Sequence, residues 1–312
     1  MNAKTAPAQS SPGKSPPAPG RSARTGLLYG LAAYIAWGFI PLYFRVLSHV
    51  QAVVVLCHRI FWSVLFLVLV ISLRREWRGV WPVLRNRRSM WLLSAGAGLI
   101  ALNWLVFIYA VISRQLLQAS LGYFINPLLS IFLGMIFLRE RLRRWQWLAV
   151  FIAGVAVLNL ALRSAELPWI ALSLAASFGF YGLVRKKVDI DSLHGLLVET
   201  SILLPIALVV LALPFAHHVS AGTLGLLSLS GVFTAMPLLF FGVALRRLQL
   251  STMGFLQYAG PTLQFLVAVV VFHEPLGGAR LASFELCWLA IGVYVADSVL
   301  ARQPQVVADE PE

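Results

Sequence analysis

Two stretches of the chain decide the fold: QASLGYFINPLLSIFLGMIFLRERL over Gln118 to Leu142, and FLQYAGPTLQFLVAVVVFHEPL over Phe255 to Leu276. Each contains an apolar run close to the roughly 20 residues that an α-helix needs to cross a bilayer core. A shift of 134 positions, the difference between 126 and 260, places Asn126-Pro127 on Gly260-Pro261. The same shift places Glu140 on Glu274. We therefore interpret the two stretches as copies of one helical unit.

The rest of the chain repeats in the same way. A shift of 141 positions, the difference between 58 and 199, places Gly38-Phe39 on Gly179-Phe180. It also places His58 on Glu199. The two shifts differ because the first copy has a longer Arg-rich loop after its second apolar run.

Apolar runs of span length divide evenly between the two copies. Because each copy holds five, an odd number, the second copy must cross the membrane in the opposite sense to the first. The sequence therefore predicts an all-α polytopic membrane protein with ten transmembrane helices in two inverted five-helix repeats, over residues 26–163 and 167–301. The ten runs lie at 26–47, 51–73, 90–113, 115–138, 145–163, 167–186, 192–213, 221–245, 250–272 and 279–301.

Composition and charge support a membrane protein. Hydrophobic residues make up 59% of the chain and charged residues only 12%, whereas a soluble domain carries about 25% charged residues. The net charge is +13, and the basic residues between the apolar runs lie in short loops. Because they do not cover a soluble face, we expect contact with lipid and no nucleic-acid partner. Twenty Lys and Arg fall on one side of the predicted topology and three on the other, which predicts that both termini are cytoplasmic. Residues 1–25 and 302–312 are predicted disordered tails, the first of them basic.

Inverted repeats are typical of secondary transporters, because two pseudo-equivalent halves can open to opposite sides of the membrane. Three ionisable residues lie well inside predicted spans, where each costs about 2.5–3.5 kcal/mol. We expect Arg59 to receive an anionic group, and Glu199 an amine or a proton. His58 is a candidate for coupling or gating, because an imidazole changes charge near neutral pH. The alternative is that the three side chains pair with each other or with helix carbonyls and hold the halves in register.

Polar and aromatic residues gather near two prolines, Pro127 and Pro261, which we predict to break their helices near the middle of the bilayer. The alternative at each proline is a simple kink. Glu140 and Glu274 end the two related spans on opposite faces, where a helix-end ion pair or gate is expected. Together with Arg59 and Glu199, the predicted solute-binding residues are Asn103, Tyr123, Asn126, Gln257 and Tyr258.

The chain contains no GxSxG, HExxH or Walker pattern, so we expect no catalysis, no cofactor and no metal site. The predicted function is transport of a small solute. A membrane-embedded enzyme, a channel and a structural membrane protein stay open as rivals, and a homodimer is compatible with the sequence.

The two opening stretches resemble the RarD branch of the EamA family, in the drug/metabolite transporter superfamily. The resemblance extends to YGLAAYIAWGFIPLYF from Tyr29, HRIFWS from His58 and ALNWLVFIYAV from Ala101, so it covers the whole membrane part. It implies ten helices in two inverted halves around a central cavity. It also implies a permease of the bacterial inner membrane, in a family whose members move amino acids, drugs and other metabolites.

Overall fold

The computed structural model describes residues 19–139, 141–163, 169–216 and 219–300, and over these residues it is helical without strands. The first half contains α1 (Pro19–Val46), α2 (Ala52–Arg74), η1 (Trp77–Gly79), α3 (Val80–Arg85), α4 (Arg87–Ile112), α5 (Leu116–Leu138) and α6 (Arg144–Arg163). The second half contains α7 (Trp169–Lys187), α8 (Ser192–Leu211), η2 (Pro214–Ala216), α9 (Ala221–Arg247), α10 (Leu250–Leu256), α11 (Ala259–Leu266), η3 (Val267–Val271) and α12 (Gly278–Leu300).

The long helices occupy the positions of the predicted apolar runs, and the ninth run is divided into α10, α11 and the π-helical η3. Seven helices in the described part of the chain are long and apolar enough to cross a membrane. Shorter apolar helices lie within α6 and α12. α7 takes the place of the sixth run and ends on Arg185, Lys186 and Lys187.

Most contacts between two helices have a counterpart, formed by the corresponding helices of the other half. α5 packs on α7 as α11 packs on α1, and α1 packs on α9 as α7 packs on α4. α2 contacts α9 and α8 contacts α4, while α6–α12 and α2–α8 are contacts between corresponding helices. This pattern is the one expected of two five-helix units around an internal twofold axis.

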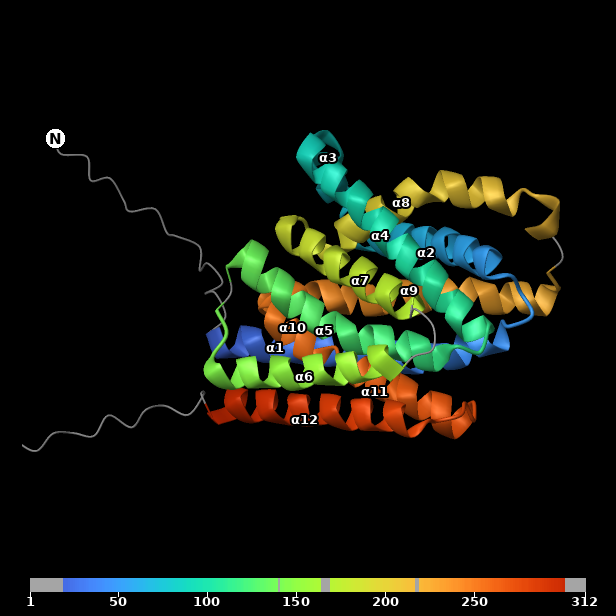
Figure 1. Ribbon diagram of the computed structural model, residues 1–312. Coiled ribbons are helices and arrows are strands. Elements are labelled where there is room, and N and C mark those ends of the chain that lie inside the picture. The colour runs from blue at the N-terminus through green and yellow to red at the C-terminus, as the bar shows by residue number, and fades with distance from the viewer. Residues whose placement is uncertain (1–18, 140, 164–168, 217–218, 301–312) are drawn as a thin grey trace, which may run out of the picture.

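The backbone also follows the 134-residue register. Arg139, after α5, and His273, after η3, both have left-handed backbone conformations, with φ of 55° and 53°. Such values are uncommon outside glycine, so their recurrence at related positions supports the repeat. The described chain begins in α1 and finishes in α12 at the same end of the bundle (Figure 1), as the predicted even number of crossings requires.

The outer surface of the bundle is apolar. Phe151, Leu158, Ile206 and Val209 are each more than half exposed, and large apolar faces of this kind belong against lipid. Inside the bundle small residues let helices approach closely. A Cβ atom on Gly122 of α5 would lie 2.6 Å from the carbonyl oxygen of Ala171 in α7.

The two predicted helix breaks have different outcomes. α5 runs through Pro127 from Leu116 to Leu138, so the predicted break there is wrong. Within a bundle, neighbouring helices can satisfy the carbonyl that a proline releases, and the helix then continues. At the related position the helix is interrupted, because α10 ends at Leu256 and α11 begins at Ala259, two residues before Pro261.

Candidate functional site

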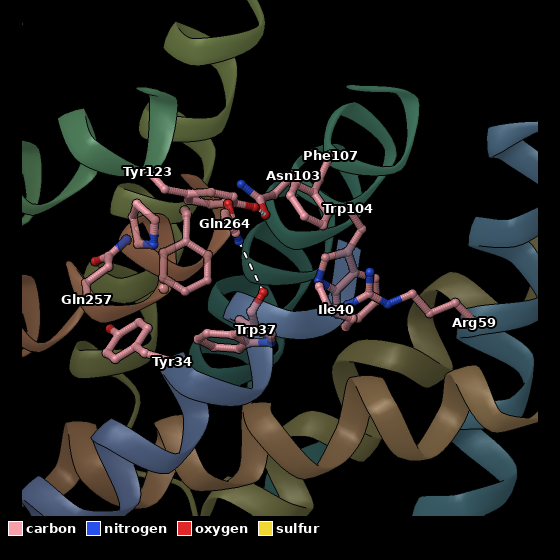
Figure 2. Close-up of a pocket in the computed structure, with 13 residues that line it drawn as sticks. Tyr34, Trp37, Ile40, Arg59, Asn103, Trp104, Phe107, Tyr123, Gln257 and Gln264 are labelled. Carbon is pink, nitrogen blue, oxygen red and sulfur yellow. Dashed lines mark hydrogen bonds between the residues drawn. The ribbon is translucent and has the colours of Figure 1, made fainter. Parts of the chain in front are cut away.

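A pocket with about 510 Å³ of empty space, including its open part, lies where the two halves meet. The first half supplies side chains from α1, α2, α4 and α5, and the second half supplies α7 and the α10–α11 segment. Figure 2 shows these residues. The pocket is lined by Tyr34, Trp37, Ile40, Arg59, Asn103, Trp104, Phe107, Tyr123, Phe178, Gln257, Gly260, Pro261 and Gln264.

Prolines disturb the helical hydrogen bonds on two sides of the pocket. Pro41 lies inside α1 and has no N–H, so the Trp37 carbonyl four residues earlier loses its helical partner. The Gln264 amide donates to that carbonyl instead, over 3.2 Å (Figure 2). Pro261 likewise cannot donate to the Gln257 carbonyl, which accepts from the Gly260 N–H at 3.1 Å. The first of these hydrogen bonds therefore joins α11 to α1, and the second is a local turn between α10 and α11.

Arg59 is buried, with 2% of its surface exposed. Its Nε donates to the hydroxyl of Thr234 in α9 at 2.5 Å. Its guanidinium carbon lies 4.3 Å from the centre of the Trp104 ring and 5.4 Å from that of Phe44, which is cation–π geometry. Within the described part of the chain, Arg59 forms no ion pair and neither Nη nitrogen forms a hydrogen bond.

Asn103 also lines the pocket, but both of its amide hydrogens are already used. Its Nδ2 donates to the Leu174 carbonyl at 3.1 Å and to the Ser177 hydroxyl at 3.0 Å, both in α7. Its Oδ1 accepts from the Tyr123 hydroxyl of α5 at 3.1 Å. Asn103 therefore joins α4, α5 and α7, and it has no amide hydrogen left for a solute.

Neutral polar groups with spare capacity lie elsewhere in the pocket wall. Gln257, at the junction of α10 and α11, is 4% exposed. The Tyr34 hydroxyl and the Gln264 Oε1 are buried and have no hydrogen-bond partner among the described residues. Such groups are costly to leave unpaired, and both belong to residues that line the pocket.

Asn126 and Tyr258, two of the predicted solute-binding residues, are not in the pocket wall. Asn126 is fully buried and accepts from the Ser130 hydroxyl at 3.2 Å. Tyr258 is 1% exposed, with its ring centre 5.7 Å from that of Phe124 and 6.1 Å from that of Phe255. Both side chains lie in the packing behind the pocket.

Glu199 belongs to a separate cluster in the second half. It is fully buried, with its Oε1 3.7 Å from an Arg185 nitrogen, and its Oε2 accepts from the Tyr181 hydroxyl at 3.2 Å. Neither Glu199 Oε1 nor Arg185 Nη1 has a hydrogen-bond partner in the described chain. His58 also lies outside the pocket, half-buried, and its Nδ1 has no such partner in those same ranges.

Glu274 caps a helix. Its carboxylate oxygens accept from the backbone N–H groups of Leu116 at 3.2 Å and Leu117 at 3.0 Å, the first residues of α5. A carboxylate is favourable there because the first N–H groups of a helix have no helical partner. Glu140 lies outside the described residues.

Sequence reasoning missed the α1 and α7 contributions and the partner of Arg59. Trp37 could have been found, because the proline four residues after it releases its carbonyl. Tyr34 shares its helix face, three positions before it. Phe178 and Thr234 carry no such local signal.

Three comparisons with known proteins agree with this architecture. The EamA-like transporter family model matches residues 24–162. The chain is 46% identical over 289 residues to "Protein RarD" of Salmonella typhi, covering 91% of this chain and 98% of that protein. It is 42% identical over 287 residues to an "Uncharacterized transporter" of Vibrio cholerae, covering 90% and 95%.

More distant matches extend the same likeness. A "Chloramphenicol-sensitive protein RarD" of Pseudomonas aeruginosa is 30% identical over 276 residues, covering 85% of this chain and 92% of that protein. A solved crystal structure aligns with a TM-score of 0.65 at 17% identity, covering 90% of this chain and 99% of the other. The structural match shows a shared fold.

Proposed function

The chain belongs to the EamA-like transporter family, in its RarD branch, and on that premise we propose that it is a secondary carrier working by alternating access. Family membership makes it a multi-pass membrane transporter of the drug/metabolite superfamily. The proposed cargo is a small organic solute and the proposed site is the bacterial inner membrane, with both termini cytoplasmic.

One observation carries this proposal: side chains from both halves line a single pocket at their junction. If residues 26–163 and 167–301 move as two units, rocking one against the other exposes that pocket first on one side and then on the other. Symmetric helix contacts favour two such states of similar energy. In this scheme the interrupted segment at Gln257 and Pro261 supplies the pocket wall that is least constrained by helical hydrogen bonds.

The test uses the purified full-length protein in proteoliposomes. A panel of amino acids, chloramphenicol and aromatic carboxylates is first screened for ligands that raise the thermal stability of the protein in detergent. A radiolabelled hit is then used for uptake. We expect saturable uptake that accelerates when unlabelled solute is present on the opposite side, because loaded carriers return faster than empty ones.

Two tryptophans of α4 give a matched pair of variants. Trp104 lines the pocket, whereas Trp91 is 78% exposed near the other end of the helix. Trp104→Leu should abolish saturable uptake, and Trp91→Leu should retain it. Flux that neither saturates nor shows exchange would indicate a channel, and equal uptake by the two variants would overturn the pocket assignment.

We further propose that Glu199 couples transport to protons. It is a fully buried acid whose Oε1 lacks a hydrogen bond among the described residues. The groups that face it are Arg185 and Tyr181 of α7 and the backbone of Gly96 in α4. Glu199→Gln should remove the dependence of net uptake on a pH gradient and leave solute exchange intact. A pH response that survives in Glu199→Gln and disappears in His58→Gln would assign the coupling to His58.

A further inference from the structure

Arg59 gives the pocket a positive charge that no acidic residue neutralises in the described part of the chain. The residue is buried, its Nε is used by Thr234, and its Nη groups bond to no other described residue. The rings of Trp104 and Phe44 partly replace water around the guanidinium, but they supply no negative charge. A buried cation of this kind is stabilised most by an oxyanion that accepts two parallel N–H bonds.

The pocket is polarised from end to end. Figure 2 shows Arg59 at one end and Gln257 and Tyr34 at the opposite end, with Trp37 and Trp104 between them. The end away from Arg59 offers neutral hydrogen-bonding groups, including the unpartnered Tyr34 hydroxyl. The middle offers flat aromatic surfaces.

None of the described residues that line the pocket is acidic. Glu199, the acid predicted to receive an amine, pairs with Arg185 in the separate cluster. An ammonium group in the pocket would therefore meet a like charge at Arg59 with no carboxylate from the lining to balance it.

We propose, on the basis of the transport function above, that the solute is an organic monoanion. It carries a carboxylate or similar oxyanion at the Arg59 end, an aromatic or other flat apolar body, and a neutral hydrogen-bonding group at the Gln257 end. Thr234 acts as a positioning residue, because its bond to Nε fixes the guanidinium and uses neither Nη group.

The test compares four compounds with the same phenyl body and different charge: 3-phenylpropanoate, 3-phenylpropan-1-ol, phenylalanine and 2-phenylethylamine. Binding to the full-length protein in detergent is followed by tryptophan fluorescence, since Trp37 and Trp104 line the pocket. We expect 3-phenylpropanoate to bind about tenfold to a hundredfold more tightly than the alcohol or the amine, the range expected for hydrogen bonds to a charged group. 3-(4-Hydroxyphenyl)propanoate should bind more tightly still.

Variants separate charge from fold. Arg59→Gln should lose the preference for the anion while its binding of the alcohol is unchanged, and Arg59→Lys should keep the preference with weaker affinity, because it loses the two-pronged geometry. Thr234→Val should weaken binding of the anion alone. Arg144→Gln, which changes an exposed arginine of α6, is the control and should bind like the unaltered protein.

The outcomes distinguish this inference from the proposed function. Tightest binding of phenylalanine or 2-phenylethylamine would mean that the aromatic rings receive an ammonium group, and equal binding of all four compounds would make Arg59 structural; either result overturns the monoanion. Saturable exchange of another solute would then still support the proposed carrier function. Arg59-dependent binding of 3-phenylpropanoate without any flux would keep the site and refute the transport role.

Discussion

The hydrogen bond between Asn103 and Tyr123 can be measured directly with a double-mutant cycle. Asn103→Ala removes three hydrogen bonds that join α4 to α5 and α7. Hydrogen bonds between membrane helices contribute about 0.6 kcal/mol each on average, so the variant should lose roughly 2 kcal/mol of unfolding free energy. Tyr123→Phe removes only one of the three bonds, and we expect a loss of about 0.6 kcal/mol.

The coupling between the two residues is the sharper quantity. The double variant should be more stable than the sum of the single effects predicts, by about 0.6–1.5 kcal/mol, because the shared bond is counted twice. Reversible unfolding in mixed detergent–SDS micelles gives the four free energies. A coupling near zero would show that the 3.1 Å contact does not hold the helices together, and it would return Asn103 to the residues available to a solute.

Two further predictions concern helix packing and capping. Glu274→Ala should lower the unfolding free energy by about 1 kcal/mol and speed hydrogen exchange at the first two amides of α5, whereas the exposed Glu285→Ala should change neither; equal effects would exclude a capping role. Gly122→Ala should cost about 1–3 kcal/mol in thermal unfolding, because its methyl group meets the α7 backbone. Gly98→Ala, into open space, should be neutral or slightly stabilising, and similar losses in both would contradict the close approach.

The fold was predictable because the lengths of the apolar runs and the spacing of the repeat can both be measured along the sequence. The 134-residue shift aligned Glu140 with Glu274, and the structure adds the matching left-handed residues Arg139 and His273. Polarity alone also led to Arg59, Asn103, Tyr123 and Gln257, which line the pocket.

The remainder of the site depends on helix rotation, which packing decides. Asn126 is as polar as Asn103 and as deep in its span, yet it bonds to Ser130 behind the pocket. The sequence predicts that Arg59 and Glu199 both contact the solute, but only Arg59 lines the pocket. The Glu199 carboxylate turns toward Arg185. Proline identity does not decide a break either, since α5 accommodates Pro127 within a continuous helix and the related segment divides before Pro261.

The guanidinium of Arg59, which forms no ion pair with the described residues, also has an electrical consequence for the proposed cycle. An empty carrier would change sides with a positive charge in its central pocket, whereas a carrier holding a monoanion would change sides neutral. Moving one charge through the full potential is worth about 2.3 kcal/mol per 100 mV. In a cell whose interior is negative, the membrane voltage would favour the state of the empty carrier whose pocket opens toward the cytoplasm. The carrier would then load solute from the cytoplasm for export.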